Sequence, residues 1–307
     1  MSRRFVGMRG WDFSVDKQLR VNRQLAGTVK VIREALNRTS LRSLLPGLEV
    51  LIGGGKLLRA RLLFRIGPAA GMDDGTLINA AASVEMVHAA SLVHDDVIDG
   101  SVIRRHAPAF WVENGAAGAI LVGDMLFCEA MRFLEHGEDA RLMPILMRFT
   151  SQMCDAEAEQ SLILRGTTPT WEDCIRLARR KTGSLFAFAA RAAGGRDDAL
   201  CAALEEAGFL LGTAYQLADD ILDAFGDGAA SDKSLGLDAR QRKVTAATAW
   251  RGGQAGLLAY VEDLCTASHD VLSAWPAVGA AWRAYVTQDI RPCLDAFTKG
   301  FVVEHAP

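Results

Sequence analysis

Hydrophobic residues recur every three to four positions along most of this chain, which is the spacing of amphipathic and buried helices. Segment 14–37 carries such a stripe on one face. Other stretches are apolar nearly all round, as helices in a protein core are. These stretches are 77–99, 116–134 and 200–225. Thr170 and Asp173 have the spacing of a helix capping box, so a further helix is expected to begin there and to run through Arg180 toward Phe188.

No stretch alternates between hydrophobic and polar residues as a half-buried strand would, so the pattern predicts an all-α protein. The clearest loops are the glycine-rich segments 53–55 and 226–231. The eight prolines are spread thinly, and no linker rich in proline and serine divides the chain. Residues 1–307 are therefore expected to form a single helical domain.

Two of the apolar segments end in a cluster of aspartates. The clusters are Asp95, Asp96 and Asp99, and Asp219, Asp220 and Asp223. Side chains four positions apart share a helix face, and like charges there destabilise a bare helix. Magnesium is the expected partner, because it prefers oxygen ligands and is often shared between carboxylates and substrate phosphates. An acidic cluster at the end of a buried helix would lie at the mouth of a cavity.

Basic residues are distributed around both clusters, as a site for phosphate groups requires. Lys56 and Arg59 lie one helical turn apart, just after glycines that let a backbone approach a phosphate closely. The other basic candidates are Arg104, Arg105, Lys181, Lys233 and Lys243. His88 lies two helical turns before Asp95, on the face of the first cluster.

Composition narrows the class of protein. The net charge of −3 lacks the basic excess of a nucleic-acid-binding protein. The six cysteines have no CxxC pair and no zinc-like spacing, which favours reduced thiols and a cytoplasmic location. The first 13 residues lack the apolar core of a signal peptide, and no apolar run of 18 residues indicates an integral membrane segment.

Six motifs follow one another between about Gly53 and Thr245. They are GGGKLLRA, SLVHDDVIDGSVIRR, VGDMLF, KTGSLF, YQLADDILD and DKSLGLDARQRKVT. In this order they resemble the conserved segments of the trans-isoprenyl diphosphate synthases, also called polyprenyl synthetases. The family counterparts are GGKRxRP, the first aspartate-rich motif with its trailing arginines, GDxLL, the KT motif, the second aspartate-rich motif and GKxxGxDLxxGKxT. The resemblance covers nearly two-thirds of the chain.

The resemblance implies a fold and an activity. The fold would be an isoprenoid synthase bundle of about ten or more helices around a deep central cavity. The activity would be the magnesium-dependent, head-to-tail condensation of isopentenyl diphosphate with an allylic diphosphate, carried out by a homodimer.

The resemblance also implies roles by position. The two aspartate clusters would hold three magnesium ions per active site. The residues that would contact the allylic diphosphate are Arg104, Lys181, Lys233 and Lys243. Those that would bind isopentenyl diphosphate are Lys56, Arg59, His88 and Arg105. Thr182 and Gln216 would lie near the reacting carbons, and with Lys181 and Lys233 they form the group expected to be catalytic.

Four residues depart from the family pattern. Leu57 stands where the family usually has Arg, and Ala60 where it has Pro. His106 and Arg242 each replace a common Gly. The basic residues of the first motif are kept, so activity is expected to be retained.

Product length should depend on the residues just before the first cluster. Ala90 and Ser91 precede Asp95 by five and four positions, where short-chain members of the family often carry an aromatic residue. Because both are small, the predicted product has about twenty carbons or more, with Phe127 or Met131 as a deeper floor.

Several alternatives remain open. A short-chain synthase making C10 or C15 products shares these motifs. A class I terpene cyclase shares the fold but usually has one DDxxD motif. Glu85 and His88 have the ExxH spacing of a di-metal oxidase, but no convincing second ExxH exists. A non-catalytic subunit of a heteromeric synthase should have lost aspartates that this chain keeps.

Overall fold

The structure, a computed structural model, describes residues 13–44, 48, 51–135, 137, 139–225 and 235–298. Its described part contains thirteen α-helices, four short 3-10 or π helices and one hairpin of two-residue strands. The all-α prediction is confirmed.

The first half of the chain contains α1 (Phe13–Leu36), η1 (Ser40–Leu44), α3 (Leu58–Ile66), η2 (Gly67–Ala70), α4 (Asp74–Asp99), β1 (Ile103–Arg104), β2 (Ala107–Pro108), α5 (Phe110–Glu135) and α6 (Leu142–Ala158). The second half contains η3 (Glu159–Ile163), α7 (Trp171–Lys181), α8 (Gly183–Ala193), α9 (Asp198–Phe225), α10 (Leu237–Gln241), α11 (Ala246–Ala249), α12 (Gly253–Asp270), α13 (Pro276–Tyr285), η4 (Val286–Ile290) and α14 (Arg291–Thr298).

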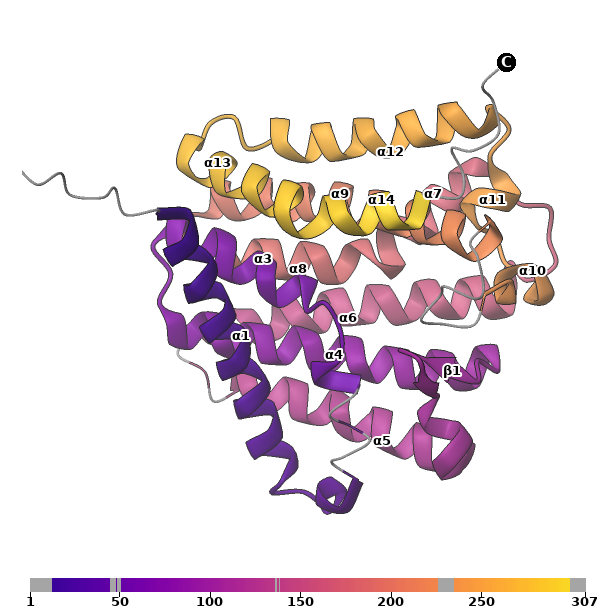
Figure 1. Cartoon of the computed structure of the whole chain (residues 1–307), viewed down its shortest axis with the longest axis horizontal. Coiled ribbons are helices and arrows are strands. Elements are labelled where there is room, and N and C mark those ends of the chain that lie inside the picture. Colours follow the sequence, from indigo (N-terminus) through magenta and orange to yellow (C-terminus); the bar gives the residue numbers. More distant parts are fainter. Residues whose placement is uncertain are drawn as a thin grey trace, which may run out of the picture.

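The long helices pack side by side in the order α5, α4, α8, α9 and α12. Figure 1 shows α5 and α12 at opposite edges of the bundle, while α1 crosses one end of it. Helix α4 is apolar nearly all round because it packs against helices on several sides, including α5, α3 and α8. By length and composition α4 could cross a membrane, but 72% of its apolar window is buried inside the protein.

The observed helix ends agree with the predicted ones at the aspartate clusters. Helix α4 ends after Asp99 because Gly100 adopts a left-handed conformation, with φ of 64°. The Gly100 and Ser101 amides then donate to the carbonyls of Val97 and Asp96, which is a Schellman motif. The motif fixes the last turn of α4, which carries the first aspartate cluster.

The prediction of a single helix from residue 170 toward Phe188 is wrong in one respect. The segment forms two helices, α7 and α8, which meet at Thr182. The break lies beside a contact that is remote in sequence, since a Cβ at Gly212 of α9 would lie 2.6 Å from the Gly183 Cα. A Cβ at Gly208 would likewise lie 2.6 Å from the Ala187 Cα. Glycine therefore lets the backbones of α8 and α9 touch.

Candidate active site

One cavity of about 880 Å³ opens at the end of the bundle where α4 and α9 finish. Its walls come from α3, α4, η3, α9 and the junction of α7 with α8. The predicted site residues that line it are Lys56, Arg59, His88, Asp95, Asp99, Arg104, Arg105, Lys181, Thr182, Gln216, Asp219, Asp223 and Lys243. The segments that carry the motifs thus meet at a single cavity, although they are far apart in sequence.

The first aspartate cluster is divided between the cavity and the protein interior. Asp95 and Asp99 line the cavity, whereas Asp96 is buried and accepts hydrogen bonds from Arg104. The Arg104 Nε and Nη2 lie 3.1 and 2.5 Å from Asp96 Oδ1. Burial, with smaller effects of Glu157 and Asp99, raises the pKa of Asp95 to about 7 although Lys181 opposes it. Asp95 is therefore a carboxylate whose charge a bound cation would stabilise.

The second cluster is divided in the same way. Asp219 and Asp223 line the cavity, and Asp223 accepts hydrogen bonds from the Gly236 and Asp238 amides at 3.2 and 3.4 Å. Asp220 instead faces α11, where it accepts from the Ala246 amide at 2.7 Å. Asp223 thereby ties the end of α9 to the start of α10.

Thr182 and Gln216 are in contact, as their predicted roles require. The Thr182 hydroxyl donates to Gln216 Oε1, and Gln216 Nε2 donates to Asp220 Oδ1 at 2.7 Å. The junction of α7 with α8 is thus joined to α9 by side chains at the point where the glycines bring the two backbones together.

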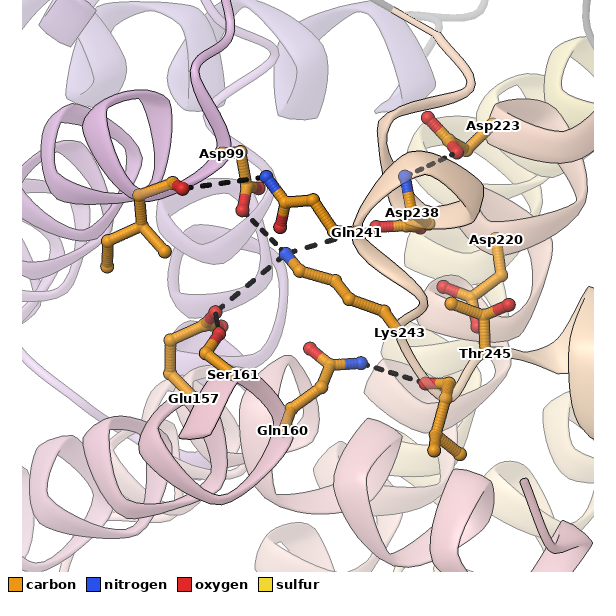
Figure 2. A network of polar contacts seen from close by, with 12 residues as sticks. Asp99, Glu157, Gln160, Ser161, Asp220, Asp223, Asp238, Gln241, Lys243 and Thr245 are labelled. Atoms are coloured by element: carbon orange, nitrogen blue, oxygen red, sulfur yellow. Dashed lines mark hydrogen bonds and ion pairs between the residues drawn. The ribbon is translucent and has the colours of Figure 1, made fainter. Parts of the chain in front are cut away.

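Two lysines lie between the aspartate clusters. Figure 2 shows the Lys243 ammonium 2.7 Å from Asp99 Oδ1, with Glu157 and Asp238 at 4.0 and 3.9 Å. Lys181 forms an ion pair with Glu157 and donates to Gln160 Oε1 at 3.2 Å. Cations and carboxylates alternate across this part of the cavity.

The position of Lys243 follows from the end of α10. The amides of Arg242 and Lys243 donate to the carbonyls of Ala239 and Asp238, which is a second Schellman motif. Arg242 is the left-handed residue of this motif, with φ of 54°. The motif ends α10 and directs the chain so that the buried Lys243 side chain meets α4.

Glu157, Gln160 and Asp238 were not predicted as site residues. Glu157 accepts from the Ser161 hydroxyl at 3.0 Å as well as from Lys181, and Gln160 Nε2 donates to the Val244 carbonyl at 2.8 Å. Burial and Asp223 raise the pKa of Asp238 to about 6. Asp238 could have been found from its place between the second cluster and Lys243 and from the aspartate of the last family motif, which it matches. Helix α6 has no comparable sequence signal.

A second group of basic residues lies at the start of α3. The Arg59 Cζ stacks 4.9 Å from the centre of the Phe186 ring, and burial lowers the pKa of Arg59. Arg105 donates to the Leu51 carbonyl at 2.6 Å, and a Cβ at Gly55 would lie 2.4 Å from the Arg105 Nη2. The absence of a side chain at Gly55 thus leaves room for the Arg105 guanidinium in its observed position.

His88 is neutral in this environment. Burial, together with the charges of Arg59 and Arg105, holds the pKa of His88 well below its ordinary value. A neutral imidazole can both donate and accept a hydrogen bond, so His88 can orient a polar ligand without adding charge.

The wall that was predicted to set product length is only partly as expected. Ser91 and Phe127 line the cavity. Ala90 is fully buried, and neither it nor Met131 is part of the lining. Lys233 falls outside the described residues.

The carboxylates fit a shared metal site better than a closed one. Among the described residues, no three His, Cys, Asp or Glu side chains converge closely enough to hold an ion by themselves. Asp95 and Asp99, and Asp219 and Asp223, instead offer oxygen atoms in pairs at the cavity wall. Such pairs suit magnesium, which completes its octahedral shell with water and phosphate oxygens.

The sequence model of the family described as polyprenyl synthetase matches residues 44–251. The chain belongs to the polyprenyl synthetase family. The family membership predicted from the ordered motifs is therefore confirmed.

Curated members of the family differ in the product they are named for. A geranylgeranyl diphosphate synthase of Mycobacterium tuberculosis is 37% identical over 62% of this chain and 57% of its own length. An octaprenyl diphosphate synthase of Haemophilus influenzae is 32% identical over 65% and 61%. A (2E,6E)-farnesyl diphosphate synthase of Mycobacterium bovis is 33% identical over 77% and 72%. The chain thus spans less than two thirds of the length of the first two relatives.

Among solved structures, a polyprenyl synthase from Caulobacter crescentus has the same fold. It superposes with a TM-score of 0.70 over 97% of this chain and 100% of its own, at 28% identity. That protein was crystallised with calcium and isoprenyl diphosphate.

Proposed function

We propose that this protein condenses isopentenyl diphosphate with an allylic diphosphate, head to tail and with magnesium, to give a longer trans-prenyl diphosphate. One observation carries the proposal. The cavity has two separate groups of basic side chains, one between the aspartate clusters and one at the start of α3. Two diphosphates can therefore be bound at once with their hydrocarbon parts between them.

The allylic diphosphate is assigned to the side of the aspartates. Asp95, Asp99, Asp219 and Asp223 would hold the ions, and Asp96 and Asp220 would act by fixing Arg104 and Gln216. We assign three magnesium ions to each site, following the family. When bound, magnesium neutralises the charge that develops on the leaving diphosphate. The calcium and isoprenyl diphosphate bound by the Caulobacter protein support a divalent ion in this role.

The side chains of the protein do the rest of the positioning. Lys181, Lys243 and Arg104 line the cavity and would offer charge to the departing diphosphate, which is electrostatic stabilisation at a preorganised site. Lys233, outside the described residues, is assigned the same role from the family motif alone. Thr182 and Gln216, which are joined by a hydrogen bond in the cavity wall, would lie next to the carbon that becomes cationic. The apolar part of the wall, including Leu185 and Met153, excludes water that would quench the cation.

Isopentenyl diphosphate is assigned to Lys56, Arg59, Arg105 and the neutral His88. Its double bond attacks the allylic cation, and a proton then leaves. The released diphosphate can accept that proton, so the protein need not supply a strong base.

We infer a product of about twenty carbons or more, because Ser91 is a small side chain in the cavity wall. The relatives, which are named for C15, C20 and C40 products, leave a C10 or C15 product as the alternative.

We further infer a cytoplasmic homodimer in which residues 1–307 act as one catalytic domain. Exposed aliphatic side chains on neighbouring helices, Ile120 and Leu121 of α5 and Met147 of α6, support an interface between two copies.

The decisive experiment incubates the full chain with magnesium, isopentenyl diphosphate and, in turn, dimethylallyl, geranyl or farnesyl diphosphate. Mass spectrometry is expected to find products longer by multiples of five carbons. Chelation should abolish the reaction and magnesium should restore it. A chain that elongates none of the three primers would refute the proposal, and one that forms a hydrocarbon without isopentenyl diphosphate would be a cyclase.

A matched pair of variants checks the site. Asp95→Asn should lower the rate at least a hundredfold, since it removes a charged oxygen that faces the cavity. Asp263→Asn, on the exposed face of α12, should leave the rate unchanged. Equal rates for the two variants would contradict the assignment.

A further inference from the structure

Large aliphatic side chains are exposed beside the mouth of the cavity. Leu162 and Ile163 of η3 have 81% and 71% of their surface exposed, and Ile98 near the end of α4 has 51%. Leu162 and Ile98 also line the cavity, so they lie at its opening rather than elsewhere on the surface. The π-helical turn of η3 presents the first two to solvent, and such turns often occur at functional sites.

Three exposed arginines lie next to these side chains. They are Arg165, Arg240 and Arg242. Arg165 Nε donates to the Gln241 carbonyl at 3.2 Å, and the Gly166 amide donates to the Arg242 carbonyl at 3.1 Å. These two bonds hold the segment after η3 against α10.

The same helix is joined to α4. Gln241 Nε2 donates to the Ile98 carbonyl at 3.5 Å. The exposed aliphatic and basic side chains therefore form one continuous edge of the cavity. We name this edge the mouth rim, and define it as Ile98, Leu162, Ile163, Arg165, Arg240 and Arg242.

The charge of the mouth rim is positive. Within the described ranges, no carboxylate pairs with the side chains of Arg240 and Arg242. The carboxylates nearby are engaged elsewhere, since Glu159 pairs with Arg176 and Arg180, and Asp238 lies 3.9 Å from the Lys243 ammonium.

Arg242 has an unusual backbone for a charged residue. Its φ of 54° is one that glycine adopts without strain, and the polyprenyl synthetase motif commonly has glycine at this position. A side chain kept in a strained conformation is a reason to look for a function of that side chain. Compared with the glycine of the family motif, Arg242 adds an exposed guanidinium group to the mouth rim.

We propose that the mouth rim docks on the surface of an anionic lipid bilayer. Exposed aliphatic side chains flanked by arginines are the chemistry that recognises such a surface, because the aliphatic groups enter the interface while the guanidinium groups bind the headgroups. Asp99, the residue after Ile98, is 19% exposed and is paired with the Lys243 ammonium at 2.7 Å, so its charge is largely compensated within the protein. One further argument rests on the proposed function: a prenyl diphosphate is an amphiphile, and docking would open the cavity toward the phase in which its tail dissolves.

A second surface of the protein gives a contrast. Exposed Leu121 and Met147 lie on α5 and α6, away from the cavity lining. The arginine next to Met147, Arg148, is paired with Glu205 at 2.8 Å. That surface lacks the free positive charge of the mouth rim and is not expected to bind lipid.

The test is co-sedimentation of the full chain with vesicles of phosphatidylcholine alone or with 30% phosphatidylglycerol. Binding is expected only with the anionic vesicles, and 0.5 M salt should abolish it. Arg165→Gln and Arg242→Gln should each weaken binding about fivefold, and Leu162→Ser with Ile163→Ser should weaken it more than tenfold. Leu19→Ser, at an exposed aliphatic position of α1 outside the cavity lining and outside the proposed dimer interface, is the matched control and should bind like the unaltered protein.

Any of four results would overturn the proposal. The first three are absence of binding to anionic vesicles, equal binding to neutral and anionic vesicles, and an equal loss of vesicle binding in the control variant. The fourth is a change of oligomeric state in the Leu162→Ser, Ile163→Ser variant, measured by light scattering, which would make the rim a protein interface. None of these measurements uses catalysis, so they are independent of whether the chain elongates a prenyl diphosphate.

Discussion

Replacing Arg242 by glycine should make the protein more stable. Arg242 is the left-handed residue at the end of α10, a position that favours glycine in helix-ending motifs. A non-glycine residue pays about 1–2 kcal/mol for this conformation. Glycine also gains freedom in the unfolded chain, which lowers the benefit by about 0.4–1 kcal/mol. The Arg242 side chain is exposed and makes no hydrogen bond or ion pair within the described part of the chain, so little else is lost.

The net gain for Arg242→Gly is therefore about 0.5–1 kcal/mol in the free energy of unfolding. With an unfolding entropy of about 2.1 cal/mol/K per residue, a chain of 307 residues should gain only about 1–1.5 °C in Tm. His106, with φ of 60° in the turn between β1 and β2, offers a second site of the same kind. The double variant should gain about 2–3 °C, which scanning calorimetry can resolve.

Two controls separate backbone strain from other effects. Arg242→Ala keeps the Cβ and the strain, so its Tm should not rise. Arg240→Gly places glycine inside α10, where φ is not left-handed, and should lower the stability by about 1 kcal/mol. The reasoning is refuted if Arg242→Gly lowers Tm or if Arg242→Ala raises it as much. If the mouth rim binds lipid, Arg242→Gly should gain stability and lose vesicle binding together.

Three further predictions concern the cavity and the helix contact behind it. Ser91→Phe should shorten the longest product found by mass spectrometry, because Ser91 lines the cavity. Ala90→Phe, in the packed interior, should mainly lower Tm. Unchanged products from a soluble Ser91→Phe variant would contradict the assignment of Ser91 to the cavity wall. Glu157→Gln removes the charged partner of Lys181 and should raise the KM for the allylic diphosphate about tenfold, so an unaltered KM would exclude a positioning role. Gly212→Ala should lower the free energy of unfolding by about 1–3 kcal/mol through overpacking. Gly27→Ala in α1, where the nearest atom to the new Cβ would lie at 3.7 Å, should not destabilise the protein. The reverse order of Tm values would be inconsistent with the observed contact.

The helices that carry the aspartates could be predicted from the sequence because their signals are local. An apolar period of 3.6 residues and a glycine just beyond Asp99 are sufficient to place the end of α4. The break at Thr182 could not be predicted in this way. The adjacent Gly183 is only a weak local signal, because an isolated glycine is tolerated inside a helix, and the break accompanies a contact with Gly212, which lies on another helix.

The candidate site could likewise be predicted only where the signal is local in sequence. Most of the aspartates and lysines that the motifs pointed to line one cavity. The sequence did not predict which aspartates face the cavity. Adjacent residues on a helix point about 100° apart, and the neighbouring elements determine which of those directions is the cavity. Arg104 turns Asp96 inward, and the Ala246 amide does the same for Asp220. Glu157 was missed because its partners are on other elements.

The glycine contact between α8 and α9 makes the position of Thr182 relative to Gln216 a property of two backbones. Side chains elsewhere in the cavity can change without altering it. A search for enzymes with new product lengths can therefore randomise the wall while Gly183, Gly208 and Gly212 stay fixed. One part of the protein then positions the reacting end of the substrate, and another part, the cavity wall, limits the length of its hydrocarbon chain.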